Sequence, residues 1–285
     1  MTGILLLTLR DLWAKKVVLG LFIVSTLAWV LLAFALNLDV VDGTLAGMRV
    51  FGQETGAAET LRHPETGEVV REALGLERIV VAVESVVAGA AYWLGTLLGL
   101  FATAPLLADL LTSGRIEGLL AKPISRVQLF GGHVAGVWLT MLLLALYLLG
   151  MVWLVMSIKT GVWNGSFFLA IGVVVGMFAV MYSVVALCVV ATGSTALSLV
   201  VAYGLVFASL ILAAKDELAP QILPPWRSVY LGFYHALPHF AEVTATVAQL
   251  SGREPVASWY PLTASLAFGG VLYVLAAVLF RRRDF

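Results

Sequence analysis

Charge is scarce in this chain. Lysine, arginine, aspartate and glutamate make up 12% of its 285 residues, whereas hydrophobic residues make up 61% and the mean hydropathy is +1.01. Globular domains average about 25% charged and about 45–50% apolar residues. A soluble 30.5 kDa domain cannot bury this much apolar surface and still cover itself with polar groups. The composition argues strongly against a soluble enzyme, a disordered chain or a nucleic-acid-binding protein, and it indicates an integral membrane protein.

Cysteine is nearly absent as well. Cys188 is the one cysteine, so the chain forms no internal disulfide and no thiolate metal cluster. Asp, Glu, Lys and Arg are absent from six apolar segments, each long enough to cross a hydrocarbon core about 30 Å thick as a helix. We therefore predict an all-α membrane protein with six transmembrane helices. The six segments are Val17–Leu36, Val86–Leu107, Leu129–Met156, Phe167–Ala191, Ala196–Ala214 and Leu262–Phe280.

The 17 basic and 17 acidic residues cancel overall, but they are distributed unevenly between the spans. If the N-terminus is cytoplasmic, the inside segments carry nine cations and four acids, and the outside segments carry eight cations and twelve acids. The inside segments are also less than half as long as the outside ones. The positive-inside rule therefore predicts a multi-pass protein of the inner (cytoplasmic) membrane, with both termini in the cytoplasm.

Residues 1–16 precede the first span and have apolar residues at helical spacing. We predict a helix that lies at the cytoplasmic membrane interface, because Lys15 and Lys16 would otherwise lie inside a membrane helix. Two alternatives stay open. The segment extends the first span, or Val17–Leu32 belongs to a signal peptide.

Two outside segments are long. Residues 39–85 contain Pro64 and Gly67 between short flanking runs, which predicts a β-hairpin or turn, followed by a helix from Arg71 to Glu84. Residues 215–261 contain six prolines separated by segments with helical periodicity, such as Phe240–Leu250. We expect this second segment to form short helices on the outer rim.

Residues 108–128, between the second and third spans, carry the strongest functional pattern. Arg115–Lys122 has the pattern of two turns of amphipathic helix, which Pro123 ends. Ser125 is then placed to cap the helix that becomes the third span. The alternative interpretation is an ordinary solvated loop with the positive charge expected of a cytoplasmic segment.

This segment resembles a known signature. Glu117-Gly118, Leu119-Leu120 and Pro123-Ile124-Ser125-Arg126 resemble the glutamate-glycine, leucine-leucine, proline-x-serine-arginine pattern of ABC-2 type permeases, the membrane subunits of ATP-binding-cassette exporters. The tail Phe280–Phe285 and the segment Leu237–Phe240 also look like segments of that family. The chain departs from the family at Gly132-His133, where lysine often follows the glycine, and in the length of its 39–85 segment.

In that family, the signature lies on the helix that contacts the ATPase. The resemblance implies that six residues couple this chain to the ATPase, namely Arg115, Ile116, Glu117, Leu119, Lys122 and Arg126. None of the five lysines follows a glycine, whereas a phosphate-binding loop ends in Gly-Lys-Ser or Gly-Lys-Thr. ATP and Mg are therefore expected on a separate cytoplasmic ABC ATPase, with no cofactor, metal or catalytic residue on this chain.

The resemblance further implies a single permease domain over 1–285 that pairs with a second copy, as a homodimer, to line a path for an exported molecule. Walls without charge suit a lipid-like or amphiphilic molecule. Two other functions stay open. Some relatives transmit ATP-driven motion to an outside protein, such as a factor that matures a metalloenzyme, and the acidic 39–85 and 215–261 segments would then be docking surfaces. The chain could otherwise be a passive membrane anchor in a larger complex.

Other transport chemistry has less support. Ion-coupled transport usually needs charged residues inside the membrane, but the spans offer only hydroxyl groups, Cys188 and His133. We interpret His133 as a membrane-interface residue. Glu84 is at the outer mouth of the second span, and we interpret it as a headgroup-level residue in the first turn of a helix.

Two spacing patterns also have structural interpretations. His235, His239 and Glu242 are spaced so that one continuous helix would place three metal ligands on one face, but Pro238 interrupts that helix. Glycines four residues apart indicate close helix packing, either within one subunit or at a dimer seam. These pairs are Gly95 with Gly99, Gly132 with Gly136, and Gly172 with Gly176.

Overall fold

The computed structural model describes residues 16–41, 44–50, 53–55, 58–62, 69–73, 75–112, 114–120 and 125–283. The predicted interfacial helix over 1–16 lies outside these residues, apart from Lys16 at its end. Within them, six helices are long and apolar enough to cross a membrane, as the sequence predicts. Their candidate spans are Val18–Ala35, Leu76–Leu110, Arg126–Thr160, Phe167–Thr192, Thr195–Ala213 and Tyr260–Arg282.

The spanning helices follow one another with short turns except at two places. The first is α2 (Val17–Ala35), and the second consists of α3 (Leu76–Ala90), a single π-helical turn η1 (Ala91–Gly95) and α4 (Thr96–Leu110). The remaining four are α6 (Arg126–Thr160), α7 (Phe167–Thr192), α8 (Thr195–Ala213) and α12 (Tyr260–Arg282). The second and third crossings are 35 residues each, about 50 Å at 1.5 Å per residue, so both continue beyond a bilayer core.

Helix α7 is the centre of the bundle. Of its most apolar 18-residue window, 72% is buried within the chain, whereas no other candidate span buries more than 33%. Helices α4, α6, α8 and α12 all pack against it. The other spans keep many large apolar side chains exposed, including Phe34 on α2, Phe101 on α4 and Phe207 on α8. Such surfaces suit a hydrocarbon solvent and would not be stable in water.

The segment between α2 and α3 is built from strands. β1 (Leu36–Val41), β2 (Thr44–Val50) and β3 (Gln53–Thr55) form one antiparallel sheet, and β4 (Ala58–Arg62) pairs with β5 (Val69–Ala73) in a second. The β4–β5 pair is the hairpin predicted around Pro64 and Gly67. The following helix starts at Leu76 instead of the predicted Arg71, because Val69–Ala73 pair with β4.

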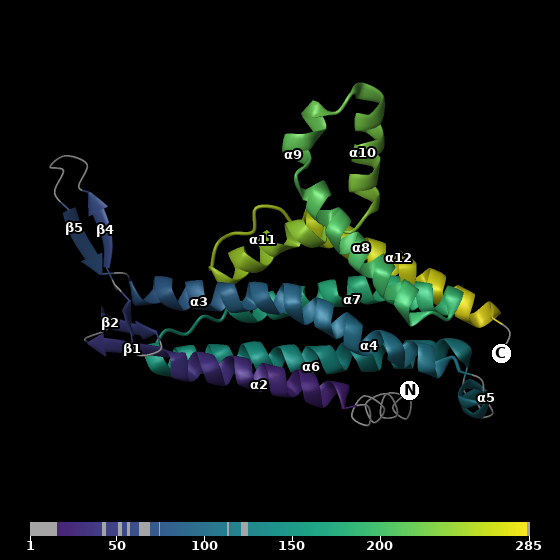
Figure 1. Cartoon of the computed structure of the whole chain (residues 1–285), viewed down its shortest axis with the longest axis horizontal. Coiled ribbons are helices and arrows are strands. Elements are labelled where there is room, and N and C mark those ends of the chain that lie inside the picture. The colour runs from purple at the N-terminus through teal and green to yellow at the C-terminus, as the bar shows by residue number, and fades with distance from the viewer. Residues whose placement is uncertain are drawn as a thin grey trace.

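The segment between α8 and α12 is helical, as expected. It consists of α9 (Lys215–Leu218), a 3₁₀ turn η2 (Ala219–Gln221), α10 (Pro224–Ala236) and α11 (Phe240–Ser251). Proline at the first position of α10 has no N–H to leave unsatisfied, and Pro238 separates α10 from α11. Helix α11 packs against α3, α7 and α8, whereas α9 and α10 project away from the bundle (Figure 1).

The loops between the spans gather at two ends of the bundle (Figure 1). The short helix α5 (Arg115–Leu120) lies near the start of α2 and the last turn of α12, and we call this the α5 end. The strands lie at the opposite end, which we call the strand end. The described N- and C-terminal residues, Lys16 and Arg283, are both at the α5 end, as an even number of crossings requires.

Candidate functional site

Ile116 anchors helix α5 to the bundle. Gly114 precedes the helix with a φ of +84°, a left-handed conformation that glycine adopts without strain. Ile116 is 1% exposed and belongs to the same buried cluster as Leu107, Leu110 and Leu129. Glu117, the next residue, is exposed. Ile116 is therefore an apolar anchor on the second and third spans, and the neighbouring charge faces outward.

The other predicted coupling residues have different surroundings. Lys122 lies outside the described residues, and for Arg115 and Leu119 the structure describes the helical backbone but not the side chain. Ser125 caps α6 as predicted, because its hydroxyl accepts a hydrogen bond from the Gln128 amide at 3.2 Å while the Gln128 side chain accepts one from the Ser125 amide. This capping box orients the chain between α5 and α6.

Arg126 is engaged with the end of the last span. Its Nη1 donates to the carbonyl oxygens of Arg281 and Arg283, at 3.2 and 2.5 Å. Arg283 in turn donates from Nη1 to the carbonyl oxygen of Val190 at 2.5 Å. Cationic side chains at helix C-termini satisfy carbonyl groups that lack intrahelical partners and interact favourably with the helix dipole. The two arginines thus connect the start of α6 with the ends of α12 and α7.

The π-helical turn connects the second span to α11. Tyr92 and Trp93 are in this turn, and the Tyr92 hydroxyl donates to the Phe240 carbonyl at 2.5 Å while their rings stack with centroids 4.6 Å apart. The Trp93 indole donates to the Thr244 hydroxyl at 3.1 Å. Single π-turns within α-helices are rare and often mark functional sites. Here the turn presents two adjacent aromatic side chains to one partner helix.

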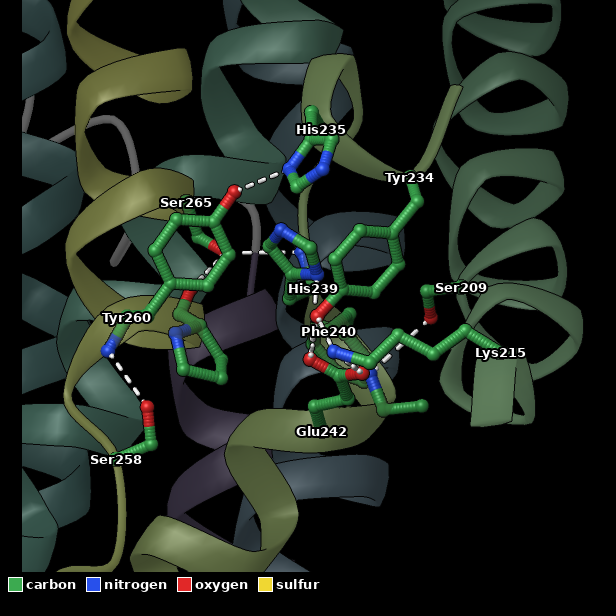
Figure 2. Close-up of polar contacts among 12 residues, drawn as sticks. Ser209, Lys215, Tyr234, His235, His239, Phe240, Glu242, Ser258, Tyr260 and Ser265 are labelled. Atoms are coloured by element: carbon green, nitrogen blue, oxygen red, sulfur yellow. Dashed lines mark hydrogen bonds and ion pairs between the residues drawn. The ribbon is translucent and has the colours of Figure 1, made fainter. Parts of the chain in front are cut away.

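A polar cluster joins α8, α9, α10, α11 and α12 (Figure 2). Lys215 Nζ donates to the Tyr234 hydroxyl at 2.6 Å, and that hydroxyl donates to Glu242 Oε2 at 2.9 Å. Lys215 Nζ lies 3.9 Å from Glu242 Oε1, and His239 Nδ1 lies 3.3 Å from Glu242 Oε2. The hydrogen bond to Tyr234 is the largest of the effects that raise the pKa of Lys215 above its ordinary value. Glu242 therefore accepts a hydrogen bond from Tyr234 and lies within ion-pair distance of Lys215 and His239.

His239 is the most enclosed member of this cluster. Its backbone amide donates to the Ser265 hydroxyl at 2.9 Å, which ties the start of α11 to α12. The side chain is 2% exposed, and its Nε2 atom has no hydrogen-bond partner. Burial lowers the pKa of His239, and the nearby Glu242 carboxylate only partly opposes that effect. We assign the neutral ring, with Nδ1 facing the Glu242 carboxylate.

The three residues at metal-ligand spacing do not form a metal site. His235 lies on α10 and shares a hydrogen bond of 2.7 Å with the Tyr260 hydroxyl, away from the Glu242 carboxylate (Figure 2). Among the residues that the structure describes, no group of three His, Cys, Asp or Glu side chains is arranged to hold a metal ion. The break at Pro238 turns His235 and His239 toward different partners.

Glu84 corrects a sequence-based interpretation. It is fully buried in the third turn of α3, because α3 starts at Leu76 and not just before Glu84. Asn164, also fully buried, donates from Nδ2 to Glu84 Oε2 at 2.6 Å and to the Ser251 carbonyl at 2.8 Å. Arg253 donates to Asn164 Oδ1 at 3.0 Å and pairs with Glu77. This network joins α3, the α6–α7 turn and the end of α11.

Asn164, Arg253 and Tyr234 were not predicted as site residues. No local sequence pattern identifies them. A polar Asn in the short turn between two apolar spans is the one available signal, because a polar side chain buried there needs hydrogen-bond partners. His133 is also more buried than a membrane-interface residue would be, and its Nε2 lies 3.4 Å from the Tyr182 hydroxyl. The contacts described above form two groups. One group, around Ile116 and Arg126, lies at the α5 end, and the other, around Asn164 and Glu242, surrounds α11.

Some of the glycines spaced four residues apart lie at close contacts between helices, and others do not. At Gly99 an added Cβ would come within 3.1 Å of Phe178 on α7, so α4 and α7 are in close contact there. The space around Gly95 and Gly172 is open, and a Cβ at Gly176 would meet Leu266 at an ordinary 3.7 Å. A close approach to the backbone of another helix is found instead at Gly269, where a Cβ would lie 3.1 Å from the Val180 Cα.

Comparison with known proteins adds no assignment to this geometry. No protein-family model matches the chain, and no curated protein matches it.

Proposed function

We propose that this chain is the permease subunit of an ABC-2 type ATP-driven exporter, and that it works as a homodimer with a separate cytoplasmic ATPase. The observation that carries the proposal is α5, a short helix anchored by Ile116 with Glu117 exposed beside it. A small helix with a buried apolar side chain on the bundle and an exposed charge beside it is suited to transmit force from a partner protein. The resemblance of its sequence to the family signature supports the same role.

Motion at α5 has a direct physical connection to α11. Helix α5 follows α4, α4 continues from the π-turn, and the π-turn binds α11 through Tyr92 and Trp93. A helix moves as a stiff body, so a displacement of its α5 end is transmitted to the contacts at its other end. In this proposal, ATP binding to two ATPases draws the α5 helices together, and the second span carries that motion to α11 and its polar cluster.

The proposed orientation places the α5 end in the cytoplasm of a cell with an inner (cytoplasmic) membrane. The positive-inside distribution supports it, because the cations of the α5 end include Arg126, Arg281, Arg282 and Arg283. The strands and the α9–α11 segment then face outward.

Apolar cavities of different size lie among the described helices. One lies between α2, α4, α6 and α7, with Ser25 and Thr96 among apolar neighbours, and its volume is about 60 Å³. Another lies between α2 and α3 and has a volume of about 450 Å³, within the range of about 300–1,000 Å³ that is typical of small-molecule pockets. The pairing of two copies in this proposal therefore rests on the resemblance to the permease family.

The deciding experiment is a pull-down of the tagged chain from its native membrane in a mild detergent, followed by mass spectrometry. We expect a stoichiometric small ATPase that carries a Gly-Lys-Ser or Gly-Lys-Thr loop. If redox or other membrane subunits co-purify in place of an ATPase, the exporter proposal is wrong and the chain is a membrane anchor.

A second experiment tests the coupling residues. We expect the double substitution Arg115→Glu with Glu117→Arg to lower ATPase recovery at least about tenfold, because reversed charges at a contact replace attraction with repulsion. Insertion and thermal stability of the chain should be unchanged, since Glu117 is exposed. Glu254→Arg, an exposed acid-to-base change in the loop after α11 and beside the α6–α7 turn, is the matched control. Full ATPase recovery with the double variant would refute the assignment of α5.

A second candidate function is transmission of motion to an outside protein. The projection of α9 and α10 from the bundle and the strands of residues 36–73 favour it, because both segments are available for protein contacts beyond the membrane (Figure 1). In that case the pull-down should recover an outside-facing protein together with the ATPase. Replacing residues 36–73 with a short Gly-Ser linker should release that protein and retain the ATPase.

A further inference from the structure

A pocket separates α9 from α10 on the part of the chain that projects from the bundle. Its volume is about 300 Å³, within the range of small-ligand sites. Lys215 and Asp216 line it from α9, and Arg227, Leu231 and Tyr234 line it from α10. Acidic, basic and apolar groups therefore converge on one space.

Some of the charged side chains around the pocket have ion-pair partners and others do not. Lys215 is committed to the Tyr234 hydroxyl and the Glu242 carboxylate. Asp216 and Arg227 are both exposed, and neither makes an ion pair or a side-chain hydrogen bond with any residue that the structure describes. One uncommitted carboxylate and one uncommitted guanidinium thus line the same pocket without pairing to each other.

We infer that this pocket binds a zwitterionic headgroup in which a phosphate and a primary ammonium are joined by a short linker, as in phosphoethanolamine. The Arg227 guanidinium presents a planar fork of N–H donors that matches two phosphate oxygens. The Asp216 carboxylate accepts hydrogen bonds from the ammonium. Lys215, whose Nζ is held by the Tyr234 hydroxyl, also lines the pocket.

An apolar surface continues from the pocket along α10. At 100° per residue, Arg227 and Leu231 lie on one face of α10, and Trp226 and Phe233 lie on the adjacent face, while Leu223 directly precedes the helix as its N-cap. The side chains of Leu223, Trp226 and Phe233 are 72%, 67% and 56% exposed. A headgroup in the pocket would therefore leave its acyl chains beside an uncovered apolar stripe, which identifies a zwitterionic phospholipid as the ligand class.

This inference deepens the proposed function by naming a substrate class, and it rests on that function only where the ligand is called a substrate. The binding test uses the full chain purified in maltoside detergent, without an ATPase. A failure to bind is therefore distinguishable from a failure to recruit the ATPase.

The probes are short-chain lipids titrated by calorimetry. We expect dihexanoyl phosphatidylethanolamine to bind saturably and at least about tenfold more tightly than dihexanoyl glycerol, which lacks the headgroup. Dihexanoyl phosphatidylglycerol, which has the phosphate but no ammonium, should have an intermediate affinity. Displacement of the lipid by free phosphoethanolamine would show that the headgroup alone is sufficient, and its failure to displace would assign the site to the lipid-attached form.

Paired variants separate specific recognition from general charge attraction. We expect Arg227→Gln to weaken both phospholipids about tenfold and Arg227→Lys to restore part of that loss. Asp216→Asn should weaken phosphatidylethanolamine alone, to the level of phosphatidylglycerol. Glu217→Gln and Arg282→Gln are the matched controls, because both residues are exposed and neither lines the pocket.

Two results would overturn the inference. The first is equal affinity for dihexanoyl glycerol and the two phospholipids. The second is an effect of Asp216→Asn or Arg227→Gln no larger than that of its matched control. All of the substituted side chains are exposed, so the variants are expected to fold.

Discussion

Buried polar side chains around α11 set the strongest constraints at the scale of single residues. Asn164 is the centre of one network, because it donates to Glu84 and Ser251 and accepts from Ser166 and Arg253. An unpartnered polar group in a buried site costs about 1–3 kcal/mol, and more if it is charged. The stability lost when such a residue is replaced therefore depends on how many buried groups lose their hydrogen-bond partner.

Asn164→Ala is therefore expected to be more costly than Glu84→Gln. The first change leaves Glu84 Oε2 and a donor of Arg253 without their partner and should lower the free energy of unfolding by about 2 kcal/mol or more. The second change keeps an oxygen for Asn164 and the shape of the side chain, so the network retains its partners. Thermal unfolding in detergent measures the order, and a Glu84→Gln variant as unstable as Asn164→Ala would contradict it.

His239 predicts a pH dependence of stability. Its pKa is lowered in the folded chain by burial, next to Lys215 and His235, although Glu242 opposes the shift. Below its ordinary pKa of about 6.5, the unfolded chain takes up a proton that the folded chain does not, so stability is lost as the pH falls from about 6.5 toward the lowered value. His239→Gln should unfold with a smaller decrease in Tm between pH 7.5 and pH 5.5. Equal decreases in the two proteins would refute the assignment of a neutral, buried ring.

At the scale of elements, α12 approaches the backbone of α7 closely at one glycine. Gly269 on α12 lies against the backbone of Val180, whereas the next residue, Gly270, has open space where a side chain would be. In lipid, helices gain stability from such close packing because the surrounding tails are as apolar as the side chains. The two neighbouring glycines therefore form an internal pair for comparison.

Gly269→Ala should lower the stability of the chain by about 1–3 kcal/mol, because an added methyl group forces α12 away from Val180. Gly270→Ala should have little effect or be slightly stabilising, since alanine has the higher helix propensity. The measurement is Tm in the same detergent for both variants. Similar Tm values for the two would show that the α7–α12 contact adjusts without cost.

The elements also show where a helix departs from regular geometry for a tertiary contact. The second crossing contains a π-helical turn, and that turn presents Tyr92 and Trp93 to Phe240 and Thr244. Hydropathy alone predicts one regular helix over residues 86–107. The irregularity has a consequence for the proposed mechanism, because it is the point at which the second span connects to α11.

At the scale of the whole molecule, the arrangement places α5 and both described ends of the chain on one side and the strands on the other (Figure 1). The uneven charge distribution predicts that the α5 end is cytoplasmic. Single cysteines introduced into a Cys188→Ser background test this. Thr112→Cys lies at the α5 end, and Gly165→Cys lies in the α6–α7 turn at the strand end; both positions are exposed.

In intact cells, a membrane-impermeant maleimide should label the cysteine at position 165 and spare the one at position 112. After the cells are opened, both should react. Labelling of position 112 alone in intact cells would reverse the proposed orientation, and with it the placement of an ATPase at α5.

The sequence by itself determined the six spans, the β4–β5 hairpin and the cap at Ser125. Each of these depends on residues that are neighbours in the chain, because hydropathy, turn chemistry and capping act over a few consecutive positions. The helix break at Pro238 was also predictable from the sequence. It separates α10 from α11, and with them the two histidines that spacing alone would place on one helix face.

Only the tertiary structure decided which polar groups meet. Asn164 is 80 residues from Glu84, Arg126 is 157 residues from Arg283, and Tyr92 is 148 residues from Phe240. A periodic pattern tells which face of a helix is apolar, but in membrane spans nearly every face is apolar, so the pattern does not tell which faces pack together. The burial of Glu84 and the cluster around Glu242 therefore came from helix packing, because packing alone selects which rare polar side chains share a site.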